Sequence, residues 1–388
     1  MKNEILIRRG LLPFILLLVA LATTFYLGNT LRIALFCLVV MFFLPIKQFY
    51  DKDAKLITAF LFFYTVISYF NGIVSGIVGV VYTIMPALIL YLFGCYIGKY
   101  WGNNRDLLVR FFLLVIVSFA SYIYINLFAN IQAVGSLVNT DRTMVSSSQD
   151  VVASATMIGL YTSLGLIGLP MFLFDKGRSW RRFFFLVAFI FSLMATVFLV
   201  NRTGLVTLLL VTAVAVWYNR KKQNNRFVFF LTLIAVFIIG YFFSDDLSSV
   251  FSAYAERNSE SSINSGGDRF HRWKDGLIYL FLYPTGWAKQ ANFAHNMWLD
   301  VSRDAGIIPF FFLFIITIRY IKLLSKFINN SSDALLKTLF VSLFTCFVSV
   351  CSVEPVIEGE ILYLGLFFMT FGVIKGLMKN TSVYERNR

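Results

Sequence analysis

The chain has 388 residues, of which 59% are hydrophobic and only 14% charged, and its formal net charge is +14. Soluble domains carry close to ~25% charged residues and could not bury so large an apolar share, so the composition excludes an ordinary soluble protein and favours a membrane protein. All the cysteines fall within apolar stretches, which is typical of small buried hydrophobic residues; they are Cys37, Cys95, Cys346 and Cys351.

Apolar stretches that are long enough to cross a bilayer as helices recur along the chain. The sequence predicts twelve, at about residues 11–28, 31–46, 56–74, 77–98, 107–128, 151–174, 183–200, 203–218, 227–243, 305–321, 335–352 and 361–378. The first stretch also resembles a signal peptide, with a weak cleavage site at Ala20-Leu21-Ala22, but a retained helix gives the even number of spans that fits the charges. We therefore expect an all-α, polytopic fold with about 12 transmembrane helices.

Basic residues are unevenly shared between the two sides of the expected membrane. If the N-terminus lies in the cytoplasm, the cytoplasmic segments hold 25 of the 34 Lys and Arg residues. This distribution follows the positive-inside rule, so both termini are predicted to be cytoplasmic. It also explains the net charge without any nucleic-acid partner.

The predicted spans divide the chain into three parts. Residues 1–243 hold helices one to nine, residues 244–304 form a large outward loop, and residues 305–388 hold helices ten to twelve and a cytoplasmic tail. A smaller outward loop covers about 129–150. The large loop contains both histidines and six of the nine outward cations. Apolar spans cannot do polar chemistry, so we expect function to reside in this loop.

Two helices are expected within the large loop. The first runs from Asp268, a candidate N-cap, to Leu282, and Tyr283-Pro284-Thr285-Gly286 ends it. Its apolar stripe is most simply a face that lies on the membrane, and this stripe consists of Phe270, Trp273, Leu277 and Phe281.

The second helix is expected to start near Asn292 or Ala294, to run to Arg303 and to end at Gly306. It would place His295, Leu299 and Ser302 on one face and Asn296, Asp300 and Arg303 on another. Asp300 and Arg303 would then form an exposed pair at i,i+3. His295 would lie at the outer surface of the membrane.

Short polar motifs follow one another on the outward side of the predicted topology. In chain order they are Asn201-Arg202-Thr203-Gly204, Arg269-Phe270-His271-Arg272-Trp273, Pro284-Thr285-Gly286, His295-Asn296-Met297-Trp298-Leu299 and Gly306-Ile307. In this order they resemble the O-antigen ligase/polymerase superfamily of bacterial inner-membrane glycosyltransferases. The resemblance covers roughly residues 185–320 in motif and the whole chain in topology. The family's glycine turn is often Gly-x-Gly, whereas this chain has Gly286-Trp287-Ala288.

The resemblance implies a glycosyltransferase of the bacterial inner membrane that acts on its periplasmic face. The donor would be a glycan linked to undecaprenyl pyrophosphate, and neither a cofactor nor a metal would be needed. A polymerase would pass the glycan to another glycan, whereas a ligase would pass it to lipid A core. We favour the polymerase. A chain-length regulator is a further candidate partner that the family suggests.

The same resemblance assigns roles to individual residues. The catalytic residues would be His295, Arg269 and Arg202, and the substrate-binding residues would be Arg272, Asn296 and Arg303. Arginines can hold a leaving diphosphate bidentately, and a histidine with a pKa near ~6.5 can serve as a general base at neutral pH. His271 has no matching role in the family and is interpreted as structural.

Other interpretations stay open at this point. The outward arginines can equally bind lipid headgroups, and Asp245-Asp246 is most simply a solvated helix end, with a metal site as the alternative. A transporter or flippase is a different class of function, but the predicted spans have no central acidic or lysine pair. A non-enzymatic scaffold of an envelope complex is a third class, which a fully functional His295 mutant would favour.

Overall fold

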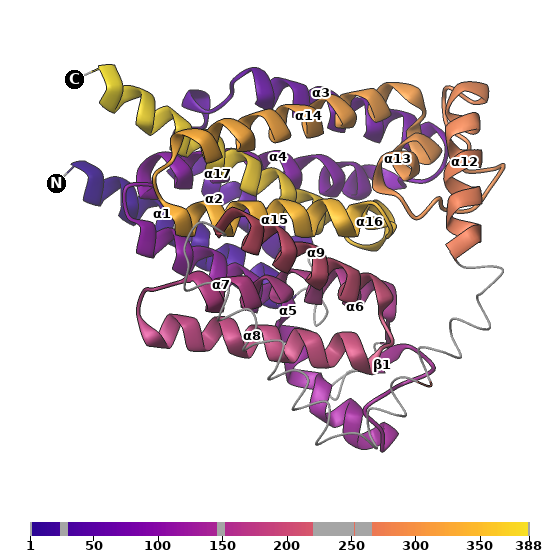
Figure 1. The fold of residues 1–388 in the computed structure, drawn as a ribbon. Coiled ribbons are helices and arrows are strands. Elements are labelled where there is room, and N and C mark those ends of the chain that lie inside the picture. The colour runs from indigo at the N-terminus through magenta and orange to yellow at the C-terminus, as the bar shows by residue number, and fades with distance from the viewer. Residues whose placement is uncertain (1, 24–29, 146–151, 220–251, 253–265, 387–388) are drawn as a thin grey trace. The chain divides into compact units, whose positions relative to one another are not determined.

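The computed structural model describes residues 2–23, 30–145, 152–219, 252 and 266–386 (Figure 1). Within these ranges the chain is almost entirely helical, and ten helices are long and apolar enough to cross a membrane. The chain is therefore a multi-pass membrane protein, as its composition predicts. The second predicted span coincides with a shorter apolar helix at Leu31–Phe43, and the predicted span at 227–243 lies outside the described residues.

Contacts between residues group the chain into two compact units. Each unit combines ranges that are distant in the sequence, unlike the three consecutive parts that the predicted spans define. Unit 1 comprises residues 1–111, 269–331 and 351–388, and unit 2 comprises residues 112–268 and 332–350. The elements of unit 1 are α1 (Lys2–Ala22), α2 (Thr30–Phe43), η1 (Ile46–Gln48), α3 (Lys52–Phe70), α4 (Gly76–Trp101), the start of α5 (Arg105–Val134), most of α12 (Gly266–Leu282), α13 (Met297–Ala305), α14 (Ile307–Asn330), α16 (Val356–Gly359) and α17 (Ile361–Arg386).

Glycines allow α4 and α17 to pack backbone against backbone in unit 1. A β-carbon at Gly94 or Gly98 would collide with main-chain carbonyls of α17, and one at Gly372 or Gly376 would collide with carbonyls of α4. Helices in a membrane associate through such small residues, because lipid tails are as apolar as leucine and close packing must supply the attraction. This helix pair forms the centre of unit 1.

Ion-paired side chains lie at one end of unit 1, and the helices of the predicted large loop lie at the other. At one end, where α1 begins and α17 ends (Figure 1), the buried carboxylate of Asp53 pairs with Arg319 and Lys375, and Asp51 accepts a hydrogen bond from Lys379 at 3.2 Å. The helices α12 and α13 lie at the opposite end (Figure 1). Sequence analysis predicts this separation between the termini and the large loop.

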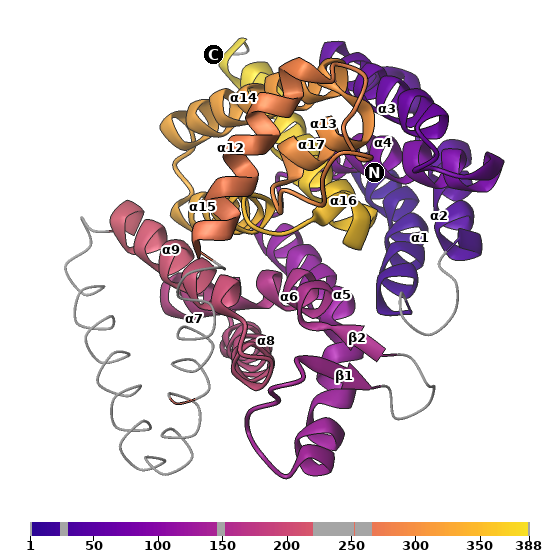
Figure 2. The ribbon, with the colours of Figure 1, turned by 90° about the vertical axis from the view of Figure 1, so that its right-hand side faces the viewer.

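Helix α12 runs across the end of unit 1, whereas α3 and α14 run along its length (Figures 1 and 2). The predicted apolar stripe is largely exposed, with Phe270 and Phe281 at 70% and 67% exposure. Trp273 is the exception, because it packs on a buried cluster formed by Trp287, Ala294 and Leu299. One edge of α12 therefore attaches the helix to the segment that carries His295.

Unit 2 consists of the remainder of α5 with β1 (Thr143–Val145), β2 (Val152–Ser154), α6 (Ala155–Ser163), η2 (Leu164–Ile167), α7 (Gly168–Phe174), α8 (Ser179–Phe198), α9 (Arg202–Asn219) and α15 (Ala334–Cys351). Two side-chain hydrogen bonds join α9 to α15. Thr207 Oγ1 lies 3.0 Å from Ser349 Oγ, and Asn219 Nδ2 donates to Thr338 Oγ1 at 2.9 Å.

Unit 2 refines two expectations. The predicted span at 151–174 is confirmed, because Ala155–Phe174 is one of the ten candidate membrane spans, but it begins after β2 and consists of α6, η2 and α7 in succession. In the predicted loop at 129–150, α5 continues to Val134, and β1 pairs with β2 as an antiparallel ladder. Asn130 holds this ladder, because its side chain donates to the Val145 carbonyl at 2.7 Å and accepts from the Val145 N–H at 2.8 Å. A hydropathy profile cannot predict side-chain hydrogen bonds of this kind.

Candidate functional site

The segment that joins α12 to α13 is fixed by backbone hydrogen bonds. The N–H groups of Trp287 and Ala288 donate to the Arg303 carbonyl at 2.8 and 3.1 Å, and the Ile307 N–H donates to Pro284 at 2.9 Å. Gly286 adopts a φ of 122°, a value that L side chains rarely adopt. Ala288 has no positive φ and serves as a hydrogen-bond donor.

His295 lies in a tight turn rather than on a helix. Its φ is 54°, and α13 begins only at Met297, after the N-cap Asn296, whose side chain accepts from the Leu299 N–H at 3.3 Å. The expectation that a helix from Asn292 or Ala294 carries His295 on its face is therefore wrong. A non-glycine residue in the left-handed region is uncommon and persists where its surroundings impose it.

The carboxylate of Asp300 imposes this turn. Its two oxygens accept hydrogen bonds from the N–H groups of Ala294 at 2.8 Å and Asn296 at 3.0 Å, the residues on either side of His295. Burial raises the pKa of the Asp300 carboxyl to about 7, although these two donors favour its ionised form. Asp300 is thus a buried support of the turn and not part of an exposed pair with Arg303.

The arginines of α12 lie beside the same turn. Arg272 Nη1 donates to the carbonyl of Phe293 at 3.4 Å, and Arg269 Nη2 forms an ion pair with Glu354 at 3.8 Å. The Arg269 side chain keeps 34% of its surface exposed. One face of α12 therefore presents a partly accessible guanidinium at the end of unit 1 that holds His295.

Two residues of the segment between α15 and α16 contact the predicted site residues. Asn296 Nδ2 donates to the carbonyl of Ser352 at 3.3 Å, and Glu354 of the same segment pairs with Arg269. Asn296 therefore connects the histidine turn to a part of the chain more than fifty residues away. Its position beside His295 is compatible with the predicted role in substrate binding, which stays a prediction.

Arg303 is buried within a polar network. Its Nη1 donates to Asp304 at 2.8 Å, its Nε donates to the Ala291 carbonyl at 3.3 Å, and its guanidinium lies 3.8 Å from the centre of the Phe293 ring. The second carboxylate oxygen of Asp304 accepts from the Tyr64 hydroxyl at 3.1 Å. This network ties α3 to α13, so Arg303 supports the architecture of the site.

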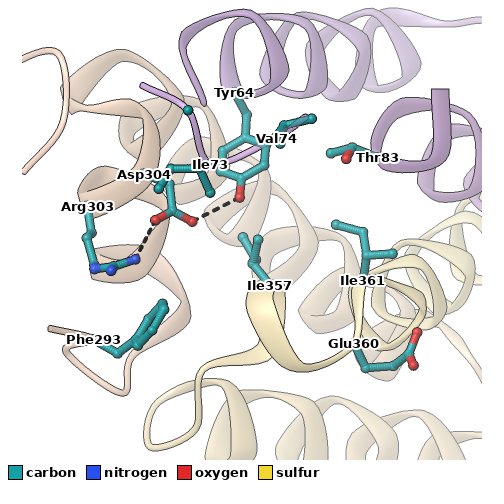
Figure 3. A pocket seen from close by; sticks show the side chains of 11 residues that line it. Tyr64, Ile73, Val74, Thr83, Phe293, Arg303, Asp304, Ile357, Glu360 and Ile361 are labelled. Carbon is teal, nitrogen blue, oxygen red and sulfur yellow. Dashed lines mark hydrogen bonds and ion pairs between the residues drawn. The ribbon is translucent and has the colours of Figure 1, made fainter. Parts of the chain in front are cut away.

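A cavity of about 530 Å³ opens beside this network in unit 1 (Figure 3). Residues from α3, the turn after it, α4, the segment before α13, α13, α16 and the start of α17 line it. These are Tyr64, Gly72, Ile73, Val74, Thr83, Phe293, Arg303, Asp304, Ile357, Glu360 and Ile361. In Figure 3 the Tyr64 hydroxyl and the Arg303 guanidinium converge on Asp304 from two sides. Small-molecule sites have volumes of about 300–1,000 Å³, and this cavity lies within that range.

Arg202 belongs to unit 2, where it begins α9. The preceding residue, Asn201, is buried and accepts a hydrogen bond from the Gly204 N–H at 3.2 Å, which fixes the turn. Five of the six predicted site residues thus lie in unit 1 and one in unit 2; those in unit 1 are Arg269, Arg272, His295, Asn296 and Arg303. The Asp245-Asp246 pair lies outside the described residues.

Sequence analysis missed the acidic and aromatic partners of these residues. Asp304 and Glu354 are 3% and 5% exposed, and each pairs with one of the predicted arginines. A signal for Glu354 was present, because three glutamates follow one another in a short segment between two apolar spans, at 354, 358 and 360. Tyr64 gave no such signal, since it is one aromatic residue among many in an apolar helix.

Comparison with known proteins adds no assignment. The chain matches no protein-family model, and no characterised protein matches it. Any functional conclusion must therefore rest on the sequence motifs and on the geometry of the site.

Proposed function

We propose that the protein is a polysaccharide polymerase of the bacterial inner membrane. It has twelve transmembrane helices, with both termini in the cytoplasm and the loop of 244–304 in the periplasm. It transfers a glycan from undecaprenyl pyrophosphate to the hydroxyl of an acceptor glycan. The reaction forms a bond between the acceptor oxygen and sugar C1 and breaks the bond between C1 and the diphosphate.

The observation that carries this proposal is the position of His295. Asp300 fixes the peptide groups on both sides of it, Arg272 binds Phe293 two residues before it, and Asn296 follows it as a helix cap. The proposed reaction needs a base for the acceptor hydroxyl and cations that stabilise the leaving diphosphate. A histidine in a turn that an arginine contacts suits both needs. Proton abstraction by a positioned base typically contributes about 10²–10⁴ in rate.

The arginines would act on the leaving group. As the bond to C1 breaks, negative charge grows on the diphosphate, and guanidinium groups stabilise it through charge-assisted hydrogen bonds worth about 1.5–3 kcal/mol each. Arg269 is suited to this role because 34% of its side chain is exposed and its ion pair with Glu354 is long, at 3.8 Å. Arg202 is the second proposed diphosphate ligand, and Arg272 would support the site through its contact with Phe293.

Reconstitution tests the proposal. Purified protein in lipid vesicles is given lipid-linked donor and acceptor, and the products are separated on a gel. Wild type and His271→Ala are expected to extend the glycan, whereas His295→Ala is expected to lose at least a hundredfold in rate while still crosslinking to a photoreactive donor. A wild-type rate in His295→Ala would refute the base. Transfer to lipid A core without chain extension would identify a ligase.

A further inference from the structure

We infer that the cavity between Tyr64, Thr83 and Asp304 binds the acceptor sugar, an uncharged and hydroxyl-rich ring, and does not bind the diphosphate of the donor. This inference rests on the proposed function, because it assigns one of the two substrates to a defined place. It adds residues of α3, α4 and α17, which lie outside the sequence motifs, to the site around Arg303.

The cavity combines polar groups with apolar walls. Tyr64, Thr83 and Asp304 line it although they are only 3%, 8% and 3% exposed, so buried side chains supply part of its polar surface. Ile357 and Ile361 supply aliphatic surface on the facing side (Figure 3). A sugar ring has the matching character, because its edge carries hydroxyls that both donate and accept while its faces present C–H groups.

The charge of the cavity wall favours the neutral acceptor over the anionic diphosphate of the donor. The lining residues include one guanidinium, that of Arg303, and two carboxylates, those of Asp304 and Glu360, so the formal charge of the wall is negative. The guanidinium is already engaged, because it donates to Asp304 at 2.8 Å and stacks on Phe293 at 3.8 Å. A diphosphate would meet a net repulsive wall, whereas neutral hydroxyls can donate to the carboxylates.

The wall of the cavity includes part of the segment that carries the proposed base. Phe293 and Arg303 form part of its wall, and Phe293 is two residues from His295 within the same fixed turn. A ring held in the cavity would therefore contact the segment that carries His295. The less buried Arg269, at 34% exposure, lies on α12 and remains available to the donor.

The inference is tested by variants that fill the cavity or remove a polar group from its wall. Val74→Trp fills it from the turn after α3, and Thr83→Val removes one hydroxyl with little change in volume. The control is Ala34→Trp, which fills a separate apolar groove of about 570 Å³ between α2 and α4. In the vesicle assay we expect the acceptor KM to rise at least tenfold in Val74→Trp and about threefold in Thr83→Val. Donor photocrosslinking should not change, and Ala34→Trp should match wild type.

A second measurement separates this inference from the proposed function. A photoreactive, uncharged acceptor oligosaccharide is added to wild type, to Thr83→Val and to His295→Ala, and the labelled peptides are identified. Labels on the 64–83 or 357–361 segments in His295→Ala, weakened by Thr83→Val, would support the inference. Glycan transfer without labels there, or donor diphosphate crosslinked there, would overturn the inference but keep the transferase. Labels there without any transfer by wild type would refute the transferase and leave a sugar-binding site.

Discussion

Asp300 holds His295 in a left-handed backbone conformation, with φ at 54°, by accepting hydrogen bonds from the peptide groups on either side of it. The carboxylate is five residues from the histidine and belongs to α13, so the helix itself fixes the turn that precedes it. A functional group on a loop gains precision when a buried side chain restrains its backbone in this way. Asp300 is accordingly a positioning residue in the proposed reaction.

Replacing Asp300 should affect the reaction without removing a reacting group. In Asp300→Asn one acceptor oxygen becomes an amide donor that faces a peptide N–H, so the turn loses a hydrogen bond. We expect the transfer rate to fall about tenfold or more, with donor crosslinking retained. Asp275→Asn, on the exposed side of α12, is the matched control and should transfer glycan like wild type. Equal rates in the two variants would show that the turn does not need Asp300.

The raised pKa of Asp300 predicts how stability depends on pH. Its folded-state pKa of about 7 exceeds the ordinary value, so the fold favours the neutral carboxyl. This contribution is fully present below about pH 4 and is lost as the pH rises through about 7. We expect the thermal midpoint of wild type to fall by several degrees more than that of Asp300→Asn between about pH 5 and pH 8. Parallel curves for the two proteins would contradict a raised pKa at this site.

Lysine should not replace the proposed diphosphate ligands. A guanidinium offers a planar, bidentate fork, whereas an ammonium is a point charge. Arg269→Lys and Arg202→Lys should each lose at least tenfold in transfer rate, and the loss should appear in donor crosslinking. Lys274→Arg on the exposed side of α12 exchanges the same two side chains at another position, keeps the charge, and should match wild type. Near-normal activity in both lysine variants would favour the alternative in which these residues bind lipid headgroups.

The predicted orientation can be tested on residues that the structure describes. Native cysteines give little background, because Cys37, Cys95, Cys346 and Cys351 are all buried. Lys289 and Lys176 are both exposed, the first in the segment before α13 and the second between α7 and α8. An impermeant thiol reagent that is added from outside should label Lys289→Cys and spare Lys176→Cys. The reverse pattern would invert the topology and remove the proposed site from the periplasm.

Much of the architecture follows from local features of the sequence. Hydropathy identifies most of the membrane helices, because burying an apolar run in lipid depends on that run alone. The extent of α12 was also predictable, since the stripe at helical spacing and the Pro-Gly turn that follows it are local signals. Local patterns failed at the start of α13, where polar residues at helical spacing suggested a helix through His295.

The sequence alone determined that this is a helical membrane protein, and it predicts that the proposed chemistry belongs to the polar segment with both histidines. Tertiary structure decided which groups meet there. Tyr64 and Asp304 are 240 residues apart, and their hydrogen bond exists only because α3 packs beside α13. The burial of Arg303 and the cavity beside it likewise depend on packing between distant helices, which no local periodicity encodes.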